Sequence, residues 1–62
     1  MLTQYDIVLK DTEVINCSGY GWLKSALSSI CYDDIYKIYK YVNKNSSIEL
    51  PLERFEKYAK KD

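Results

Sequence analysis

Tyrosine and lysine side chains alternate along residues 35–42, the segment of this chain best suited to bind a ligand. Its sequence, IYKIYKYV, carries three tyrosines and two lysines. As a β-strand, the segment would place Tyr36, Ile38 and Lys40 on one face and Lys37 and Tyr39 on the other. Aromatic faces stack on planar rings, and cations attract phosphate or carboxylate groups. One of the two faces must stay exposed, and we expect that face to bind a small anionic molecule with a planar ring. The alternative is that the tyrosines pack across strands beneath the lysine stems.

Two further segments supply candidate binding residues. Trp22 ends the sequence GYGW, and tryptophan is typical of binding hot spots. The alternative is that Trp22 anchors the start of a helix on the core. Arg54 belongs to a basic C-terminal segment, for which a solvated helix face is the default interpretation. The candidates are three aromatic residues that would stack on a base and three cations that would meet a phosphate: Trp22, Tyr36 and Tyr39, with Lys37, Lys40 and Arg54.

Residues for catalysis and for metal binding are scarce. The 62 residues include no histidine, the side chain that most often performs acid–base chemistry near neutral pH. Neither Cys17 nor Cys31 has a histidine available to lower the pKa of its thiol. The adjacent Asp33 and Asp34 favour a helix cap or a solvated turn over a metal site. We therefore expect a protein that binds its ligand without transforming it, with no cofactor and no metal ion.

Chain length and cysteine content bear on stability and location. Residues 1–62 suffice for a single small domain, which at this length buries only about 60% of its unfolded surface. The first residues, MLTQYD, show no secretory signal, so we expect a cytoplasmic protein with Cys17 and Cys31 as free, buried thiols. No apolar stretch approaches the roughly 20 residues that cross a membrane. Self-association as a homo-oligomer is the expected source of additional stability.

The formal net charge of zero hides an uneven distribution. Residues 1–34 hold two lysines against five acids, a net charge of −3, and residues 35–62 have a net charge of +3. The chain thus lacks the strongly basic stripe of a general nucleic-acid binder and the acidic surface of a DNA mimic. Nucleic acid is therefore the least favoured partner.

Hydrophobic periodicity indicates an α+β fold. Alternating apolar residues in 5–10 and 13–17 predict the two strands of a hairpin. Residues 22–31 switch to a helical stripe that would cover one side of this hairpin. Residues 35–42 fit a strand or a helix capped by Asp33, and their β-branched and aromatic side chains favour the strand.

The last third of the chain predicts a second hairpin and a second helix. Residues 48–50 alternate again after an Asn/Ser-rich turn, and Pro51 ends this strand. Pro51 also suits the first turn of a helix, whose apolar stripe would be Leu52, Phe55 and Ala59. The expected fold is a small α+β domain of two β-hairpins and two short helices, in the order ββαββα.

In its residue usage the chain resembles the very short proteins encoded by phages and prophages of AT-rich hosts. The similarity is carried by YDIVLKDTEVINC, DDIYKIYKYV and IELPLERF, and by heavy use of Lys, Ile, Tyr and Asn. Several proteins of that class counter a host defence system. Some sequester an immune nucleotide signal, and others block a defence enzyme by contact. The resemblance in residue usage extends over most of the chain, and it assigns no role to any single residue.

These features predict a non-catalytic, homo-oligomeric inhibitor of a host defence system that acts in the host cytoplasm and sequesters an anionic nucleotide signal. The alternative is a protein–protein inhibitor that blocks a host defence enzyme through a Tyr-rich face. The chain has seven tyrosines and one phenylalanine, which favours solvent-exposed or interfacial positions for the tyrosine rings. A tyrosine buried in the core would need a hydrogen-bond partner for its hydroxyl group. A third hypothesis is a small regulatory nucleic-acid-binding protein that uses the basic second half.

Overall fold

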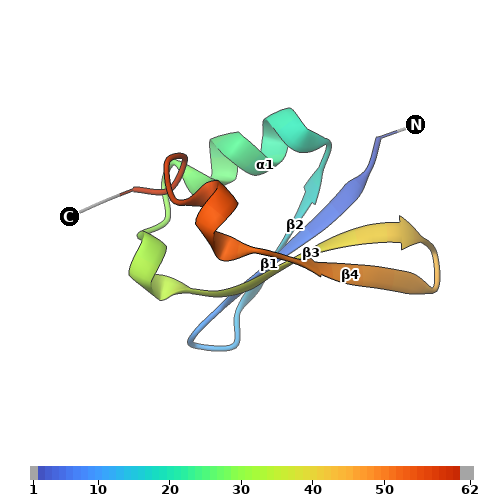
Figure 1. Ribbon diagram of the computed structural model, residues 1–62, viewed down its shortest axis with the longest axis horizontal. Coiled ribbons are helices and arrows are strands. Elements are labelled where there is room, and N and C mark those ends of the chain that lie inside the picture. Colours follow the sequence, from blue (N-terminus) through green and yellow to red (C-terminus); the bar gives the residue numbers. More distant parts are fainter. Residues whose placement is uncertain (1, 61–62) are drawn as a thin grey trace.

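The computed structural model describes residues 2–60, which form one antiparallel sheet with a helix on one face (Figure 1). The strand order is β2–β1–β3–β4, so the two hairpins lie side by side with β1 and β3 in the centre. The predicted α+β class and both hairpins are confirmed, and residues 35–42 lie in a strand. The elements in chain order are β1 (Gln4–Leu9), β2 (Val14–Ser18), α1 (Tyr20–Leu27), η1 (Tyr32–Asp34), β3 (Ile35–Asn43), β4 (Ser46–Leu50) and η2 (Leu52–Phe55).

Helix α1 begins and ends earlier than the sequence predicts. Gly19 forms its N-cap with a φ of 93°, a left-handed value that residues with a side chain rarely adopt. Tyr20 and Gly21, expected in a loop, therefore lie in the first helical turn. At the other end, the hydroxyl groups of Ser28 and Ser29 donate to backbone carbonyl groups of the last turn. These bonds satisfy acceptors that a longer helix would have used.

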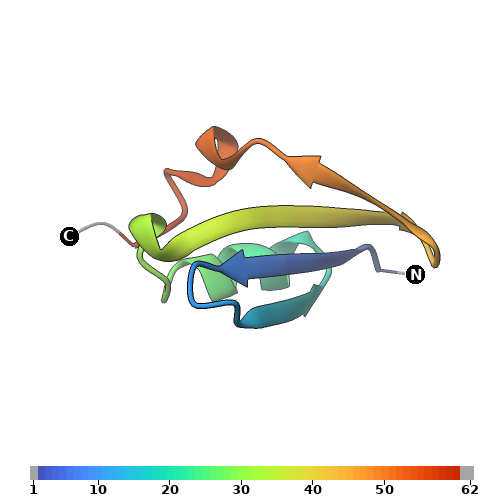
Figure 2. The ribbon, with the colours of Figure 1, turned by 90° about the horizontal axis from the view of Figure 1, so that it is seen from below.

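The core lies between α1 and the covered face of the sheet. Leu23 and Leu27 of α1 join Ile7 and Ile38 of the central strands, and all four are fully buried. Burial of each such side chain contributes about 1.5–3 kcal/mol. In Figure 2, α1 lies behind the sheet and the opposite face is open. The remaining core residues are Tyr5, Cys17, Ile35, Phe55 and Ala59.

Strand β3 does not alternate as regularly as predicted. Its register with β1 shifts between Val8 and Leu9, where Tyr36 is the extra residue of a β-bulge. The bulge lets Ile35 and Ile38 both reach the core, although they are three residues apart. The prediction that Tyr36 packs on the same face as Ile38 is therefore wrong, and 56% of the Tyr36 side chain is exposed.

The C-terminal segment is not the helix that the sequence predicts, so the fold contains one α-helix among the described residues and not two. A single 3₁₀ turn, η2, is followed by a bend that brings Lys60 beside Cys31. The Lys60 N–H group donates to the Ile30 carbonyl at 2.9 Å, and the Tyr32 N–H group donates to the Lys60 carbonyl at 3.0 Å. These tertiary hydrogen bonds need an extended chain at Lys60. They override the helical periodicity of a segment too short to be stable as an isolated helix.

The two hairpins diverge at one end of the sheet (Figure 1). The ladder between β1 and β3 ends where Tyr5 lies opposite Lys40. Beyond that pair, β1 continues to pair with β2, and β3 continues to pair with β4. The sheet therefore opens into a notch between the start of β1 and the end of β3.

No disulfide joins Cys17 and Cys31, as expected. Cys17 is fully buried, but Cys31 is only half-buried, so the prediction of two buried thiols holds for Cys17 alone. Burial, with a smaller effect of the Asp6 carboxylate, raises the pKa of the Cys17 thiol above its ordinary value of 9.0. The thiol is therefore protonated at neutral pH. No helix within residues 2–60 is long and apolar enough to cross a membrane.

Candidate functional site

Four aromatic rings meet where α1 and the C-terminal segment lie against the sheet. The Tyr20 ring is central: its centroid lies 6.1 Å from that of Tyr5, 6.4 Å from that of Phe55 and 6.4 Å from that of Tyr58. Aromatic rings at these separations attract one another. Tyr5 and Phe55 are buried, whereas 44% of Tyr20 is exposed. The cluster therefore offers part of the Tyr20 ring to a ligand.

A hollow of about 240 Å³ opens beside Tyr20. It combines aromatic and aliphatic surface with two cations, and no acid lines it. Lys40 comes from β3, and Arg54 comes from η2. Such a surface is suited to an anionic group attached to a planar ring. The walls of the hollow are Tyr5, Tyr20, Lys40, Leu50, Arg54 and Phe55.

Two more cations flank the ring cluster. Lys24 follows Tyr20 by one turn of α1, and its Nζ lies 5.4 Å from the Tyr20 ring centre and 5.6 Å from that of Tyr58. The Nζ of Lys57 lies 5.2 Å from the Tyr58 ring centre. These distances are within the range of about 6 Å at which a ring attracts a cation. These rings and cations together define the Tyr20 site: Tyr5, Tyr20, Phe55 and Tyr58, with Lys24, Lys40, Arg54 and Lys57.

No acid lines the hollow that Lys40 and Arg54 share. An ion pair joins Lys37 and Glu49 on the open face of the sheet, away from the Tyr20 site. None of the four cations of the Tyr20 site takes part in it. Their mutual repulsion costs stability, and a bound anion would relieve that repulsion.

A hydrogen bond between the hydroxyl groups of Tyr20 and Tyr58 connects the two sides of the site. Chiefly because of this bond, the pKa of Tyr20 is raised above its ordinary value of 10.0. The pKa of Tyr58 is lowered, first by the same bond and then by the charges of Lys57 and Lys24. The surroundings of the Tyr58 hydroxyl group favour negative charge.

The structure brings two of the six predicted site residues together. Lys40 and Arg54 line the same hollow, although they are 14 positions apart in the chain. Trp22 lies on α1 with 64% of its side chain exposed, so the interpretation that it anchors the helix on the core is wrong. Tyr36 and Tyr39 do not line this hollow and cannot stack on a base bound between Lys40 and Arg54.

The predicted cation of the open face, Lys37, is already paired. Its Nζ lies 3.2 Å from Glu49 Oε1 and 5.4 Å from the centre of the Tyr36 ring. The hydrogen bond with Glu49 is the main reason why the pKa of Lys37 is raised. Nearby, the Tyr41 hydroxyl group donates to the Asp6 carboxylate at 2.9 Å. This face therefore satisfies its own charges and attracts anions less than the Tyr20 site does.

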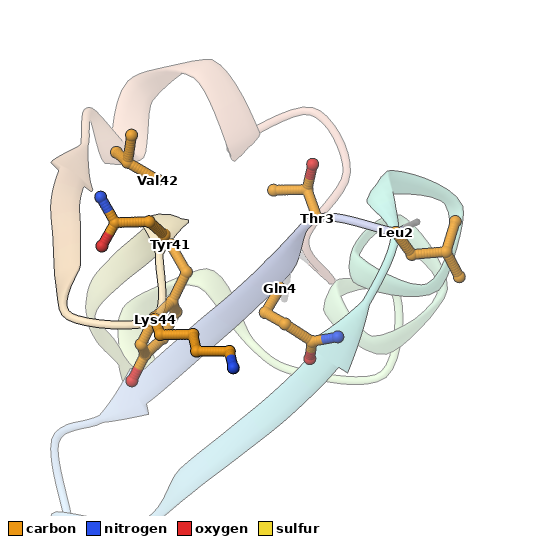
Figure 3. Close-up of a pocket in the computed structure, with 7 residues that line it drawn as sticks. Leu2, Thr3, Gln4, Tyr41, Val42 and Lys44 are labelled. Carbon is orange, nitrogen blue, oxygen red and sulfur yellow. The ribbon is translucent and has the colours of Figure 1, made fainter.

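The notch between the hairpins is a second hollow, of about 290 Å³ (Figure 3). Its walls are mainly apolar and include Leu2 and Val42. Lys44 is the one charged residue among them, and its side chain extends toward Gln4 in Figure 3. With a single cation, the notch suits an apolar group or an extended peptide better than a multiply charged ligand.

Sequence reasoning missed the rings that form the Tyr20 site. Tyr20 and Lys24 are four residues apart, a spacing that places side chains together on a helix. The glycines around Tyr20 predicted a loop and hid this signal. Tyr5 and Tyr58 join the site through the packing of β1 and the C-terminal segment, for which the sequence carries no local pattern.

Residues 2–60 contain no group of three or more Cys, Asp or Glu side chains that could hold a metal ion. Comparison of the chain with protein-family models, curated proteins and solved structures found no match. Function must therefore be inferred from the geometry of the Tyr20 site.

Proposed function

We propose that the protein binds, without transforming it, a small anionic molecule that contains a planar ring, and that this ligand is a nucleotide. One observation carries the proposal: two cations and no acid line the hollow beside Tyr20, and two more cations lie near the rings of the same cluster. Stacking of a base on an aromatic side chain contributes about 1–3 kcal/mol. Charge-assisted hydrogen bonds to phosphate add both affinity and geometric selectivity.

In this proposal the phosphate group enters the hollow and the base stacks on the exposed part of the Tyr20 ring. Arg54 donates two parallel hydrogen bonds to the phosphate from its planar guanidinium group, and Lys40 contributes a compact charge. Leu50 and Phe55 provide apolar walls that exclude water. Exclusion of water strengthens the electrostatic attraction between the phosphate and both cations.

We further propose that binding withholds a nucleotide signal from a host defence system in the cytoplasm of a phage-infected cell. The support for this setting is the resemblance in residue usage to phage-encoded counter-defence proteins. A sequestering protein needs no acid–base catalyst, which agrees with a chain without histidine. Self-association belongs to the same proposal. Val14–Ser18 forms an outer strand without the charges and prolines that commonly block edge pairing.

A thermal-shift screen against linear and cyclic nucleotides tests the proposal. A ligand at 100 times its dissociation constant should add about 2.7 kcal/mol of stability, which raises the melting temperature of so small a domain by about 10 °C or more. Arg54→Ala and Lys40→Ala should each remove most of that shift. Lys10→Ala, which removes an exposed lysine in the β1–β2 turn, is the matched control and should keep the shift. A screen without any selective shift would contradict the proposal.

A second candidate function is inhibition of a host protein through the open face of the sheet. It is favoured by the exposed Tyr36 and Tyr41, on a face that no helix covers (Figure 2). Tyrosine is enriched at protein interfaces because it provides a large contact area and a hydroxyl group. Co-purification of one host protein at a fixed ratio, together with no response to nucleotides, would favour this function over the first.

A further inference from the structure

We infer that the ligand of the Tyr20 site carries two separate anionic groups, one held by Lys40 and Arg54 and the other by Lys24 and Lys57. The inference rests on the proposed function and adds the class of ligand to it. That class is a nucleotide with phosphate groups at two different positions of the sugar. A nucleotide with a single phosphate group would fill half of the site.

The second anion subsite lies between α1 and the C-terminal segment. The Nζ of Lys24 is 5.4 Å from the Tyr20 ring centre and 5.6 Å from that of Tyr58. The Nζ of Lys57 is 5.2 Å from the same Tyr58 ring centre. Both ammonium groups are thus held near one ring. Each has three N–H donors, so donors remain available for an anion.

The Tyr20 ring stands between this subsite and the hollow. Tyr20 is a wall of the hollow that also contains Lys40 and Arg54, whereas Lys24 and Lys57 do not line that hollow. A single phosphate group in the hollow would therefore be in contact with Lys40 and Arg54 and not with Lys24 and Lys57. A base stacked on Tyr20 would have one cation pair on each side, so a phosphate group on each side of the sugar fits the arrangement.

Charge complementarity sets the number of anionic groups. The four cations carry one positive charge each, and the ion pair between Lys37 and Glu49 involves none of them. A phosphate monoester carries about −1.5 to −2 at neutral pH. One such group neutralises about half of the positive charge, and two groups match it. After the interaction with Tyr20, which is the largest cause, the charges of Lys57 and Lys24 also lower the pKa of Tyr58.

Isothermal titration calorimetry with matched nucleotides tests the second subsite. The probes are AMP and adenosine 3′,5′-bisphosphate, and GMP and guanosine 3′,5′-bisphosphate. For the unmodified protein, we expect the bisphosphate of the preferred base to bind at least about 10-fold more tightly than the monophosphate. In Lys24→Ala/Lys57→Ala this ratio should fall to about 3-fold or less, with the affinity for the monophosphate unchanged.

Two further double variants serve as controls, one for a folding defect and one for the loss of positive charge in general. Lys24→Gln/Lys57→Gln retains the side-chain stems over the rings and should lower the ratio as the alanine pair does, which excludes a folding defect as the cause. Lys10→Ala/Lys44→Ala removes the same charge from exposed positions elsewhere and should leave the ratio unchanged. Equal ratios in all variants would overturn the inference while the proposed function stands. Absence of binding by all four probes would overturn both.

Discussion

The ring and the hydroxyl group of Tyr20 contact different neighbours. The ring packs against Tyr5 and Phe55, and 44% of the side chain faces solvent. The hydroxyl group interacts with that of Tyr58, whose ring lies close to both Lys24 and Lys57. One side chain therefore connects the hollow to the second pair of cations.

At the residue scale, alkaline pH should weaken ligand binding before ordinary tyrosines ionise. The pKa of Tyr58 lies below its ordinary value of 10.0, and that of Tyr20 lies above it. As pH rises, Tyr58 therefore loses its proton first and places a negative charge beside Lys24 and Lys57. That charge repels a phosphate group, so the affinity for adenosine 3′,5′-bisphosphate should begin to fall before the pH reaches 10.0, the ordinary pKa of tyrosine.

Calorimetric titrations at several pH values check this expectation, together with the ultraviolet absorbance of tyrosinate. Tyr58→Phe keeps the ring and removes the ionisable group. Its affinity should not fall over the pH range in which that of the unmodified protein does. The same pH profile in Tyr58→Phe and in the unmodified protein would show that Tyr58 does not control binding.

At the element scale, the apolar stripe of α1 should account for much of the stability. Leu23 is fully buried, and its neighbour Trp22 is 64% exposed. Leu23→Ala should lower the free energy of unfolding by about 2–5 kcal/mol, because it removes core contacts and leaves a cavity. Trp22→Ala should change it by no more than about 0.5 kcal/mol, as for most surface substitutions.

Urea denaturation of the two variants measures both effects. Trp22 is the single tryptophan of the chain, so unfolding is better followed by circular dichroism than by fluorescence. If Trp22→Ala proved as destabilising as Leu23→Ala, Trp22 would be an anchor of the helix on the core after all.

Local patterns predicted the strands well and the helices less well. β-branched and aromatic residues identified β3, and alternation identified β1 with Tyr5 and Ile7 on its core face. The bulge at Tyr36 was not predictable, because it depends on the register of β3 against β1. The C-terminal segment had a helical stripe, but its end is fixed by hydrogen bonds to Ile30 and Tyr32, distant in sequence.

At the scale of the whole molecule, the fold brings cations from both the acidic and the basic half of the chain together in one site. Residues 1–34 have a net charge of −3, yet they contribute Lys24 to the Tyr20 site. The basic half contributes Lys40, Arg54 and Lys57 from β3 and from the C-terminal segment. The sequence named two of these four cations as site residues. Lys24 and Lys57 become neighbours only when α1 and the C-terminal segment pack together.

The most direct test of the central claim is a two-dimensional ¹H–¹⁵N NMR titration of the protein with the nucleotide that gives the largest thermal shift. Binding at the Tyr20 site predicts that amide signals of Tyr20, Lys40 and Arg54 move first and saturate together. Signals of Tyr36 and Tyr39, on residues that do not line the hollow, should move little. The largest changes at Tyr36 and Tyr39, or no saturable change at Tyr20, would contradict a nucleotide site beside Tyr20.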